Sequence, residues 1–499
     1  MSPHPAAIGA GIARILALAG ALAVIAPAHA EVREVATPPE LASAIESAQP
    51  GDEIVIAEGE WLDAGIEIDC SGTAEAPIVI HPRTPGGLAL TGASWIRLVG
   101  AHVVLRGVQM RGGARAVAGD GVEREQRSSP IDMQGDFCRV TECAIVDYNP
   151  VGREARYMWV VMRGVGNRVD RCWFQGQDHS GVTLTVNVER GRPNDARIDH
   201  NWFAGKPPLG ENGGETIRIG TSNVSVYDSR TIVEDNLFEH CDGEGEIVSN
   251  KSCANTYRRN TFRECAGELT LRHGDRCLVQ ANVFLCGDYP GSRGIRVVGR
   301  DHRIVNNYIA RPDRYGIALQ AGIPDTPLSG YVQVQRALIA CNTIFAPTGD
   351  CIRLVSEETE GMLPAIDSTF ANNILLGPER AVFFRAPNPE DVVWAGNIAW
   401  GGELGIEPRA GLTWADPLLV EGEGGLLRPA PGSPAIDAAA GQYDYEHPSE
   451  LLWQLANITT DIDGQPRDEQ ADIGCDELSD APIVTRPLTS ADVGPSWMN

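Results

Sequence analysis

Lysine is almost absent from this chain of 499 residues. Lys206 and Lys251 are the only two, and every other basic residue is an arginine. Arginine stays protonated in proteins, whereas a lysine ammonium shifts its pKa readily when it is buried or lies near other cations. A lysine retained in such a composition can therefore do what a guanidinium does not. We interpret Lys251 as a candidate general base, with an ordinary surface residue as the alternative.

Long apolar runs are missing after the first 30 residues. Within that segment, Arg14, the apolar run 15–25 and the tripeptide Ala28-His29-Ala30 have the form of a signal peptide. The run is too short for a permanent membrane span. We therefore expect residues 1–30 to be removed and the protein to be exported, either to the periplasm or outside the cell. No integral membrane segment is expected after this cleavage.

Positive charge is also scarce, and the formal net charge is −26 at pH 7. Nucleic acid is therefore not an expected partner, because binding to phosphates needs an electropositive surface. An anionic substrate remains compatible with this composition, since a local basic groove or a bound divalent cation reverses the sign where it matters. Export permits disulfides among the 12 cysteines, but their connectivity stays open at this stage.

Short β-like runs separated by turn residues fill the chain from about residue 78. A repeat of the form Asn-x-apolar follows many of them, at Asn201, Asn236, Asn260, Asn282, Asn307, Asn342, Asn373 and Asn397. Successive asparagines lie 35, 24, 22, 25, 35, 31 and 24 residues apart. A unit of about two dozen residues with occasional insertions is typical of a right-handed parallel β-helix. We interpret the asparagines as structural residues that satisfy backbone groups at the turns.

The predicted fold is all-β: a single-domain right-handed parallel β-helix over residues 31–404. A short helix that begins at Pro38-Pro39 is expected to cover its open end, followed by a strand over Glu53–Ala57. Residues 405–499 are expected to form the last part of the β-helix, an irregular cap over the last coil and a tail. The acidic segment that begins at Asp461 could also be a calcium loop, but it lacks the full EF-hand pattern.

The stretch 212–273 contains the residue types that carry chemistry. Cys241 and Cys265, like Cys253 and Cys277, are 24 residues apart, which favours stacked cysteines inside the coils over disulfides. Aligning the coils on these cysteines places Glu244 over Glu268 and Glu246 over Thr270. The same alignment puts Arg218 in one column with Arg272.

Strand alternation then directs Glu244 and Glu246 outward on the same face. Paired carboxylates are costly unless a cation or an arginine lies between them. With Asn212 they form an oxygen-rich set that could hold a hard cation. An ordinary solvated sheet face is the alternative.

The motifs NGGETIRIG, EIVSNKS and LTLRHG, in this order and at this spacing, resemble polysaccharide lyase family 6, which contains alginate lyases and chondroitinase B. The resemblance covers most of the mature chain and implies a right-handed parallel β-helix that uses Ca²⁺. It implies that Asn212, Glu244 and Glu246 hold the calcium. It further implies that Lys251 is the base, that Arg272 is the acid, and that the substrate lies near three further residues, namely Glu215, Arg218 and His273.

The reaction that the resemblance implies is β-elimination in a uronate polymer, most simply alginate. The base removes the proton at C5, and the O4 leaving group departs. A cation on the neighbouring carboxylate stabilises the enolate-like intermediate. A guanidinium hardly ever releases its proton, so Arg272 would instead hydrogen-bond the leaving oxygen or the carboxylate.

Three alternatives remain open at this point. The polymer could be dermatan sulfate, which would require further arginines along the groove. Glu244 and Glu246 could be the acid and base of a β-helix hydrolase. A non-catalytic carbohydrate-binding β-helix would not need Lys251. The residues also leave open the preference for mannuronate or guluronate, endo or exo action, and the oligomeric state.

Overall fold

The computed structural model describes residues 30–115, 129–153, 155–210, 212–346, 348–355, 362–384, 392–441 and 458–498. The expected signal peptide lies outside these ranges apart from Ala30. Within them, no helix combines the length and the apolar character that crossing a membrane requires.

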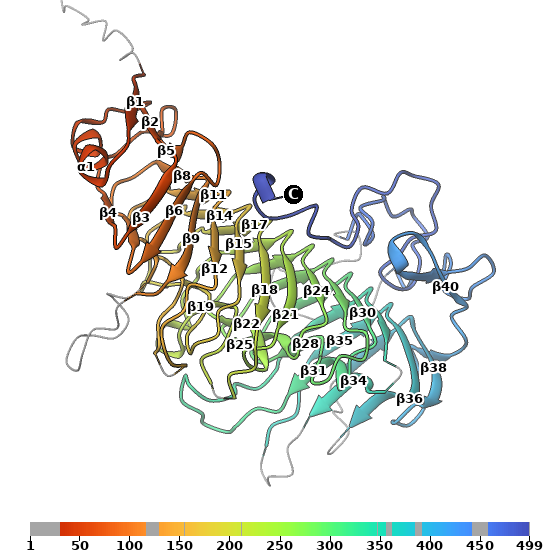
Figure 1. Ribbon diagram of the computed structural model, residues 1–499. Coiled ribbons are helices and arrows are strands. Elements are labelled where there is room, and N and C mark those ends of the chain that lie inside the picture. The colour runs from red at the N-terminus through yellow and green to blue at the C-terminus, as the bar shows by residue number, and fades with distance from the viewer. Residues whose placement is uncertain are drawn as a thin grey trace, which may run out of the picture.

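Short parallel strands stack along one axis into a right-handed parallel β-helix, as predicted (Figure 1). Its coils have three faces. The first face consists of β1 (Val32–Val35), β2 (Glu53–Ile56), β5 (Ile78–Pro82), β8 (Val103–Arg106), β11 (Arg139–Thr141), β14 (Arg168–Asp170), β17 (Arg197–Asp199), β20 (Ile232–Glu234), β23 (Thr256–Arg258), β26 (Leu278–Gln280), β29 (Arg303–Val305), β32 (Leu338–Ala340), β35 (Ser368–Ala371) and β37 (Val392–Ala395).

The second face consists of β3 (Gly59–Leu62), β6 (Leu88–Gly92), β9 (Val108–Gly113), β12 (Ala144–Val146), β15 (Trp173–Gln175), β18 (Trp202–Lys206), β21 (Leu237–Cys241), β24 (Thr261–Arg263), β27 (Val283–Leu285), β30 (Tyr308–Ala310), β33 (Thr343–Phe345), β36 (Ile374–Phe384), β38 (Asn397–Glu403) and β39 (Leu412–Trp414). The third face consists of β4 (Gly65–Ile68), β7 (Trp95–Leu98), β10 (Ile131–Met133), β13 (Val160–Met162), β16 (Leu184–Val186), β19 (Ile217–Gly220), β22 (Glu246–Lys251), β25 (Glu268–His273), β28 (Ile295–Val297), β31 (Tyr315–Gln320) and β34 (Asp350–Val355). Strand β36 also pairs with β34, so it joins the second and third faces.

Like residues stack on like inside the coils. Five phenylalanines on the second face form a column in which neighbouring ring centroids lie 4.5–5.1 Å apart: Phe174, Phe203, Phe238, Phe262 and Phe284. All are buried. Each coil buries too little apolar surface to be stable alone, so this stacking makes neighbouring coils depend on one another.

The asparagine repeat forms a continuous hydrogen-bonded ladder, which confirms its structural interpretation. Asn260 is typical: its Nδ2 donates to the carbonyl oxygen of Val233 and to Oδ1 of Asn282, both at 2.9 Å. Its own Oδ1 accepts from the backbone N–H and the side-chain amide of Asn236. The same pattern joins Asn201, Asn236, Asn260, Asn282, Asn307, Asn342, Asn373 and Asn397.

Replacement of Asn260 by alanine is expected to lower the free energy of unfolding by about 2–4 kcal/mol. Several buried groups lose a partner, at about 1–3 kcal/mol for each group left unsatisfied. Urea-induced unfolding measures the change. The control is Val226→Ala, at a position that is 56% exposed, where we expect a change within about 0.5 kcal/mol. An equally small effect for Asn260→Ala would show that the ladder does not stabilise the coils.

All twelve cysteines lie in the described ranges and none forms a disulfide. Eleven of them are buried. Cys241 and Cys265 stack in adjacent coils, where the backbone N–H of Cys241 lies 3.4 Å from Sγ of Cys265. The cysteines therefore act as small apolar residues inside the coils, as the 24-residue spacing favoured.

Helix α1 (Pro38–Ser47) covers the open N-terminal end of the β-helix (Figure 1). Thr37 caps the helix by accepting the N–H of Glu40, and proline occupies its first turn. Leu41, Ala44 and Ile45 are its buried residues. The capping helix predicted from Pro38-Pro39 is confirmed, and β2 follows where the strand was expected.

The C-terminal segment differs from the expected cap over the last coil. After the hairpin of β40 (Leu419–Glu421) and β41 (Leu427–Pro429), the segment 475–497 runs back towards the N-terminal end, where Figure 1 marks the C-terminus. The N–H of Cys475 donates to Thr343, and that of Leu488 donates to Thr261. The indole of Trp497 donates to the carbonyl of Glu142. These partners come from coils far apart in sequence, which local patterns do not reveal.

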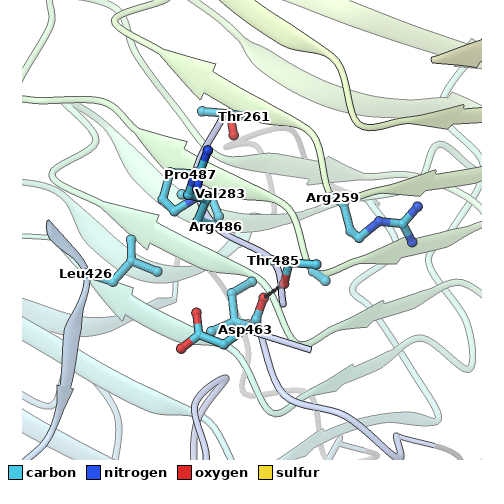
Figure 2. A pocket seen from close by; sticks show the side chains of 10 residues that line it. Arg259, Thr261, Val283, Leu426, Asp463, Thr485, Arg486 and Pro487 are labelled. Carbon is cyan, nitrogen blue, oxygen red and sulfur yellow. Dashed lines mark hydrogen bonds between the residues drawn. The ribbon is translucent and has the colours of Figure 1, made fainter. Parts of the chain in front are cut away.

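Figure 2 shows a small cavity between this tail and strands β24 and β27. It is lined by residues such as Thr261, Val283 and Thr485, and none of the predicted site residues takes part. Nearby, Asp461, Asp463 and Asp476 bring carboxylate oxygens within 4.8 Å of one another. The guanidinium of Arg428 contacts Asp463 and Asp476. An arginine thus supplies the countercharge in the segment that resembles a calcium loop.

Candidate active site on the third face

The predicted site residues come together on the outer side of three adjacent strands, β19, β22 and β25. Glu215 lies just before β19, and Glu244 lies in the turn before β22. Glu246 and Lys251 are the first and last residues of β22. Arg272 and His273 end β25. The parallel stacking of coils therefore brings residues about 25–35 positions apart into one site.

A bulge in β22 corrects the register expected from the cysteine spacing. Glu246 pairs with Glu268, and the irregularity that follows pairs Val248 with Leu269 and Ser249 with Thr270. Glu246 therefore does not stack on Thr270, nor Glu244 on Glu268, as the cysteine alignment had placed them. The extra residue, Ile247, shifts the strand without changing the spacing of the flanking cysteines.

Arg218 consequently does not share a column with Arg272. It stacks on Ser249 and, through it, on Thr270. The next residue in that column is Arg296 of β28. Nε of Arg218 is buried without a hydrogen-bond partner among the described residues.

Three carboxylates form an acidic cluster: Glu215, Glu244 and Glu246 each contribute an oxygen within 4.8 Å of the others. Glu244 accepts the backbone N–H groups of Gly213 and Gly214, at 2.7 and 3.3 Å. Burial, followed by the charge of Glu215, raises the pKa of Glu244 to about 7. The cluster therefore lacks positive charge where its carboxylates converge.

Glu215 was expected beside the substrate, and the structure places it within this cluster. Its side chain is buried, and Oε2 has no hydrogen-bond partner among the described residues. A buried carboxylate oxygen without a donor is costly. A hard cation, which takes oxygen ligands, would satisfy it. The donor set thus fits Ca²⁺ or a similar ion.

Asn212, the third expected ligand, is exposed and directly precedes Gly213. Gly213 has φ +103°, a conformation that side chains rarely adopt, and a Cβ there would lie 2.2 Å from Nη2 of Arg156. This glycine turn directs the N–H of Gly213 to Glu244 and leaves Asn212 at the edge of the cluster. No contact of the Asn212 side chain marks it as a ligand.

Lys251 lies beside the acidic cluster. Its Nζ is 3.4 Å from Oε1 of Glu215, and its side chain is 17% exposed. Across the strands it pairs with Gly220 on one side and with His273 on the other. The amine is therefore held at the surface of the site, next to carboxylates and accessible to a polymer.

Arg272 is enclosed by a loop from a later coil. Its guanidinium carbon lies 4.1 Å from the ring centroid of Tyr331, and its Nη atoms donate to the carbonyls of Ser329 and Gly330. Its Nε is 3.8 Å from Glu246. Burial lowers the pKa of Arg272 from its ordinary value. An arginine still keeps its proton, so this residue acts as a fixed donor.

His273 is buried next to Arg272. Burial, and then the charges of Arg272 and Lys251, lower the pKa of His273 to about 3. The imidazole is therefore neutral near pH 7. Its Nδ1 faces Nη1 of Arg272 at 3.4 Å and so accepts, and its Nε2 lies 3.1 Å from Oγ of Ser222. His273 thus orients Arg272.

Arg296 and Glu268 also belong to this surface, although the sequence motifs did not single out roles for them. Nη2 of Arg296 lies 2.5 Å from Glu246, and its Nε lies 2.8 Å from Glu268. Burial opposes its charge, but Glu268 and Glu246 together raise the pKa of Arg296 above its ordinary value. Tyr315 donates to Glu268. The alternation in the segment Ile295–Val297, stacked on β25, was the signal that would have found Arg296.

Comparisons with known proteins agree with this arrangement. The family model of chondroitinase B matches residues 35–353. No curated relative matches the chain. The chain is similar to the solved structure of AlyGC, an alginate lyase of polysaccharide lyase family 6, with 28% identity and a TM-score of 0.77. That match covers 93% of this chain and 58% of AlyGC, so this chain spans little more than half of that enzyme.

Two further structures show the same fold. One is a mannuronic acid specific family 6 lyase from human gut microbiota, with 28% identity and a TM-score of 0.70, covering 78% of this chain and 92% of that one. The other is a family 6 alginate lyase in complex with a trisaccharide, at 23% identity and a TM-score of 0.68, covering 80% and 91%. The family model spans more than half of the chain and includes the acidic cluster, Lys251 and Arg272, and the chain therefore belongs to the chondroitinase B family, in polysaccharide lyase family 6.

Proposed function

We propose that this protein is a Ca²⁺-dependent lyase that cleaves uronate-containing polysaccharide, with alginate as the substrate, and leaves 4,5-unsaturated uronate ends. The observation that carries the proposal is the position of Lys251, whose amine lies beside a three-carboxylate cluster and near Arg272 on one exposed face. The two relatives at 28% identity are an alginate lyase and a mannuronic acid specific lyase, which supports alginate.

Glu215, Glu244 and Glu246 would hold the metal, with Asn212 at the edge of the cluster as a further oxygen ligand. Bound Ca²⁺ would neutralise the uronate carboxylate next to C5 and so make the C5 proton more acidic. The unpartnered oxygen of Glu215 and the raised pKa of Glu244 both support a cation at this place.

Lys251, as a neutral amine, removes the C5 proton. The electron pair of the C5–H bond forms the C4–C5 double bond, and the bond from C4 to O4 breaks. The departing O4 takes up a proton, either from the ammonium of Lys251 or from water. Arg272 hydrogen-bonds the leaving oxygen or the uronate carboxylate without releasing a proton. Neutral His273 keeps this guanidinium in place.

The arginines of this face explain how a chain with a net charge of −26 binds a polyanion. Arg218, Arg272 and Arg296 lie next to one another around the acidic cluster. Their charge is local, and a bound cation would add to it. We infer an anionic polysaccharide as the partner and no role for nucleic acid.

Dermatan sulfate is the second candidate substrate, because the family model that matches the chain is that of chondroitinase B. Incubation with alginate and with dermatan sulfate separates the two. We expect alginate to yield products that absorb near the ultraviolet edge, from the new double bond. New reducing ends without this absorbance would mean hydrolysis, and no cleavage of either polymer would favour a binding protein.

We also infer that the protein is exported to the periplasm or secreted. The support is the sequence of residues 1–30, with Arg14, the apolar run 15–25 and the site after Ala30. N-terminal sequencing of the cellular protein is expected to begin at Glu31. Functional protein that still carries Met1 would contradict export by this signal.

A further inference from the structure

Lys206, the second of the two lysines, has no role in the reaction described above, yet it lies directly behind the acidic cluster. It ends β18 and is only 3% exposed. Its Nζ donates to Oε1 of Gln177 at 2.9 Å and to the carbonyl oxygens of Gly181 at 2.8 Å and Glu215 at 3.0 Å. The ammonium thus joins the backbone of Glu215 to the preceding coil.

The number of acceptors matches the number of hydrogens on an ammonium. A lysine ammonium has three donors, and three acceptors lie within 3.0 Å of Nζ. The nearby hydroxyl of Thr183 donates its own hydrogen to Gln177 Oε1, at 2.5 Å. A neutral amine would turn its lone pair towards one of these oxygens, so the geometry favours the charged form. Burial opposes that form and lowers the pKa of Lys206 to about 7.

The aliphatic part of the side chain supports the second arm of the cluster. A Cβ on Gly243 would lie 2.7 Å from Cε and 3.0 Å from Cδ of Lys206, so the stem passes closely behind this glycine. Gly243 directly precedes Glu244. The backbone of Lys206 also accepts the N–H of Asp242 at 2.8 Å. One side chain therefore contacts the backbone of Glu215 and the residue before Glu244.

An arginine would not replace Lys206 here. The guanidinium is planar and longer, with five donors in a fixed fork, whereas the three acceptors surround a single point. This explains why lysine is retained at a buried position in a chain that otherwise uses arginine.

We propose that Lys206 is a positioning residue of the metal site: its ammonium holds the carbonyl of Glu215, and its stem supports Gly243, so that Glu215 and Glu244 stay at a separation that binds Ca²⁺. This inference rests on the proposed function of the cluster. Residues behind a metal site that orient its ligands typically contribute a factor of about 10–100 to metal affinity.

The test is calorimetric titration of Ca²⁺ into metal-free protein, without substrate, for wild type and Lys206→Met. Methionine keeps most of the stem and removes the donors. We expect the Kd for Ca²⁺ to rise about 10–100-fold, with kcat at saturating Ca²⁺ within about threefold of wild type. Asn260→Ala is the matched control, because it removes buried hydrogen bonds away from the cluster and is expected to lower stability without changing this Kd.

An unchanged Kd in a folded Lys206→Met variant, even with a lowered melting temperature, would overturn the proposal and leave Lys206 as a packing residue. Wild-type protein that does not bind Ca²⁺ would instead overturn the proposed metal site itself. If Lys206→Met does not fold, Thr183→Val takes its place, since it removes only the hydroxyl that orients Gln177. We expect a rise in Kd of about threefold for this milder change to the supporting contacts, and no change would again overturn the proposal.

Discussion

Replacement of Lys251 by arginine is expected to lower kcat on alginate by about 10²–10⁴, towards the upper end of that range. The change keeps the positive charge and most of the apolar stem. A guanidinium does not accept the C5 proton at any accessible pH. Among the described residues around the cluster, Lys251 is the amine on the exposed side, since Lys206 is buried and its donors are engaged. Substrate binding should persist.

The measurement is kcat for the variant, together with substrate affinity and a circular dichroism spectrum as a folding control. Arg83→Lys exchanges the same two residue types at a position whose side chain is 55% exposed, and it should leave kcat unchanged. A Lys251→Arg variant within about threefold of wild type, a difference in activation free energy below about 1 kcal/mol, would exclude Lys251 as the base.

Removal of calcium is expected to have an effect of similar size. Chelator-treated protein should lose activity by about 10³-fold, or about 4 kcal/mol in activation free energy, and regain it when Ca²⁺ is added. The β-sheet circular dichroism should stay unchanged, because the asparagine ladder and the stacked phenylalanines hold the coils together without the metal. Full activity in metal-free protein would overturn the proposed role of the cluster.

Glu244→Gln tests the same site within the protein. Glutamine has nearly the same shape and still accepts the N–H of Gly213 through its carbonyl oxygen, but it removes a charged ligand. We expect activity at limiting Ca²⁺ to fall as it does on chelation, with partial recovery at high Ca²⁺. Glu264→Gln, at a side chain that is 50% exposed, is the matched control and should retain activity. Equal Ca²⁺ affinity in the two variants would mean that Glu244 is not a ligand.

The fold could be predicted because its signal is repetitive. Every asparagine of the repeat occupies the same ladder, and the cysteines stack with the spacing that the sequence indicated. In a β-helix each residue contacts its counterpart one coil later, so a period in the sequence is a contact in space. The same regularity allowed Glu244, Glu246, Lys251, Arg272 and His273 to be assigned to one face.

The details of the site could not be predicted in the same way. The bulge at Ile247 shifts the register of β22, so the column of Arg218 contains Arg296 and not Arg272. A bulge adds a residue without altering the spacing of its flanking residues. The position of Glu215 inside the acidic cluster also depends on the turn at Gly213, whose conformation is a local geometric choice.

The sequence by itself determined the β-helix, the capping helix and the face that carries the charged residues, because alternation and period encode which side chains face inward. The tertiary structure alone decided that Glu215 joins the carboxylates, that Lys206 lies buried behind them, and that the tail returns to Thr261 and Glu142. These contacts join segments with no common period. Their formation depends on the shape and burial of the assembled coils, which no local pattern records.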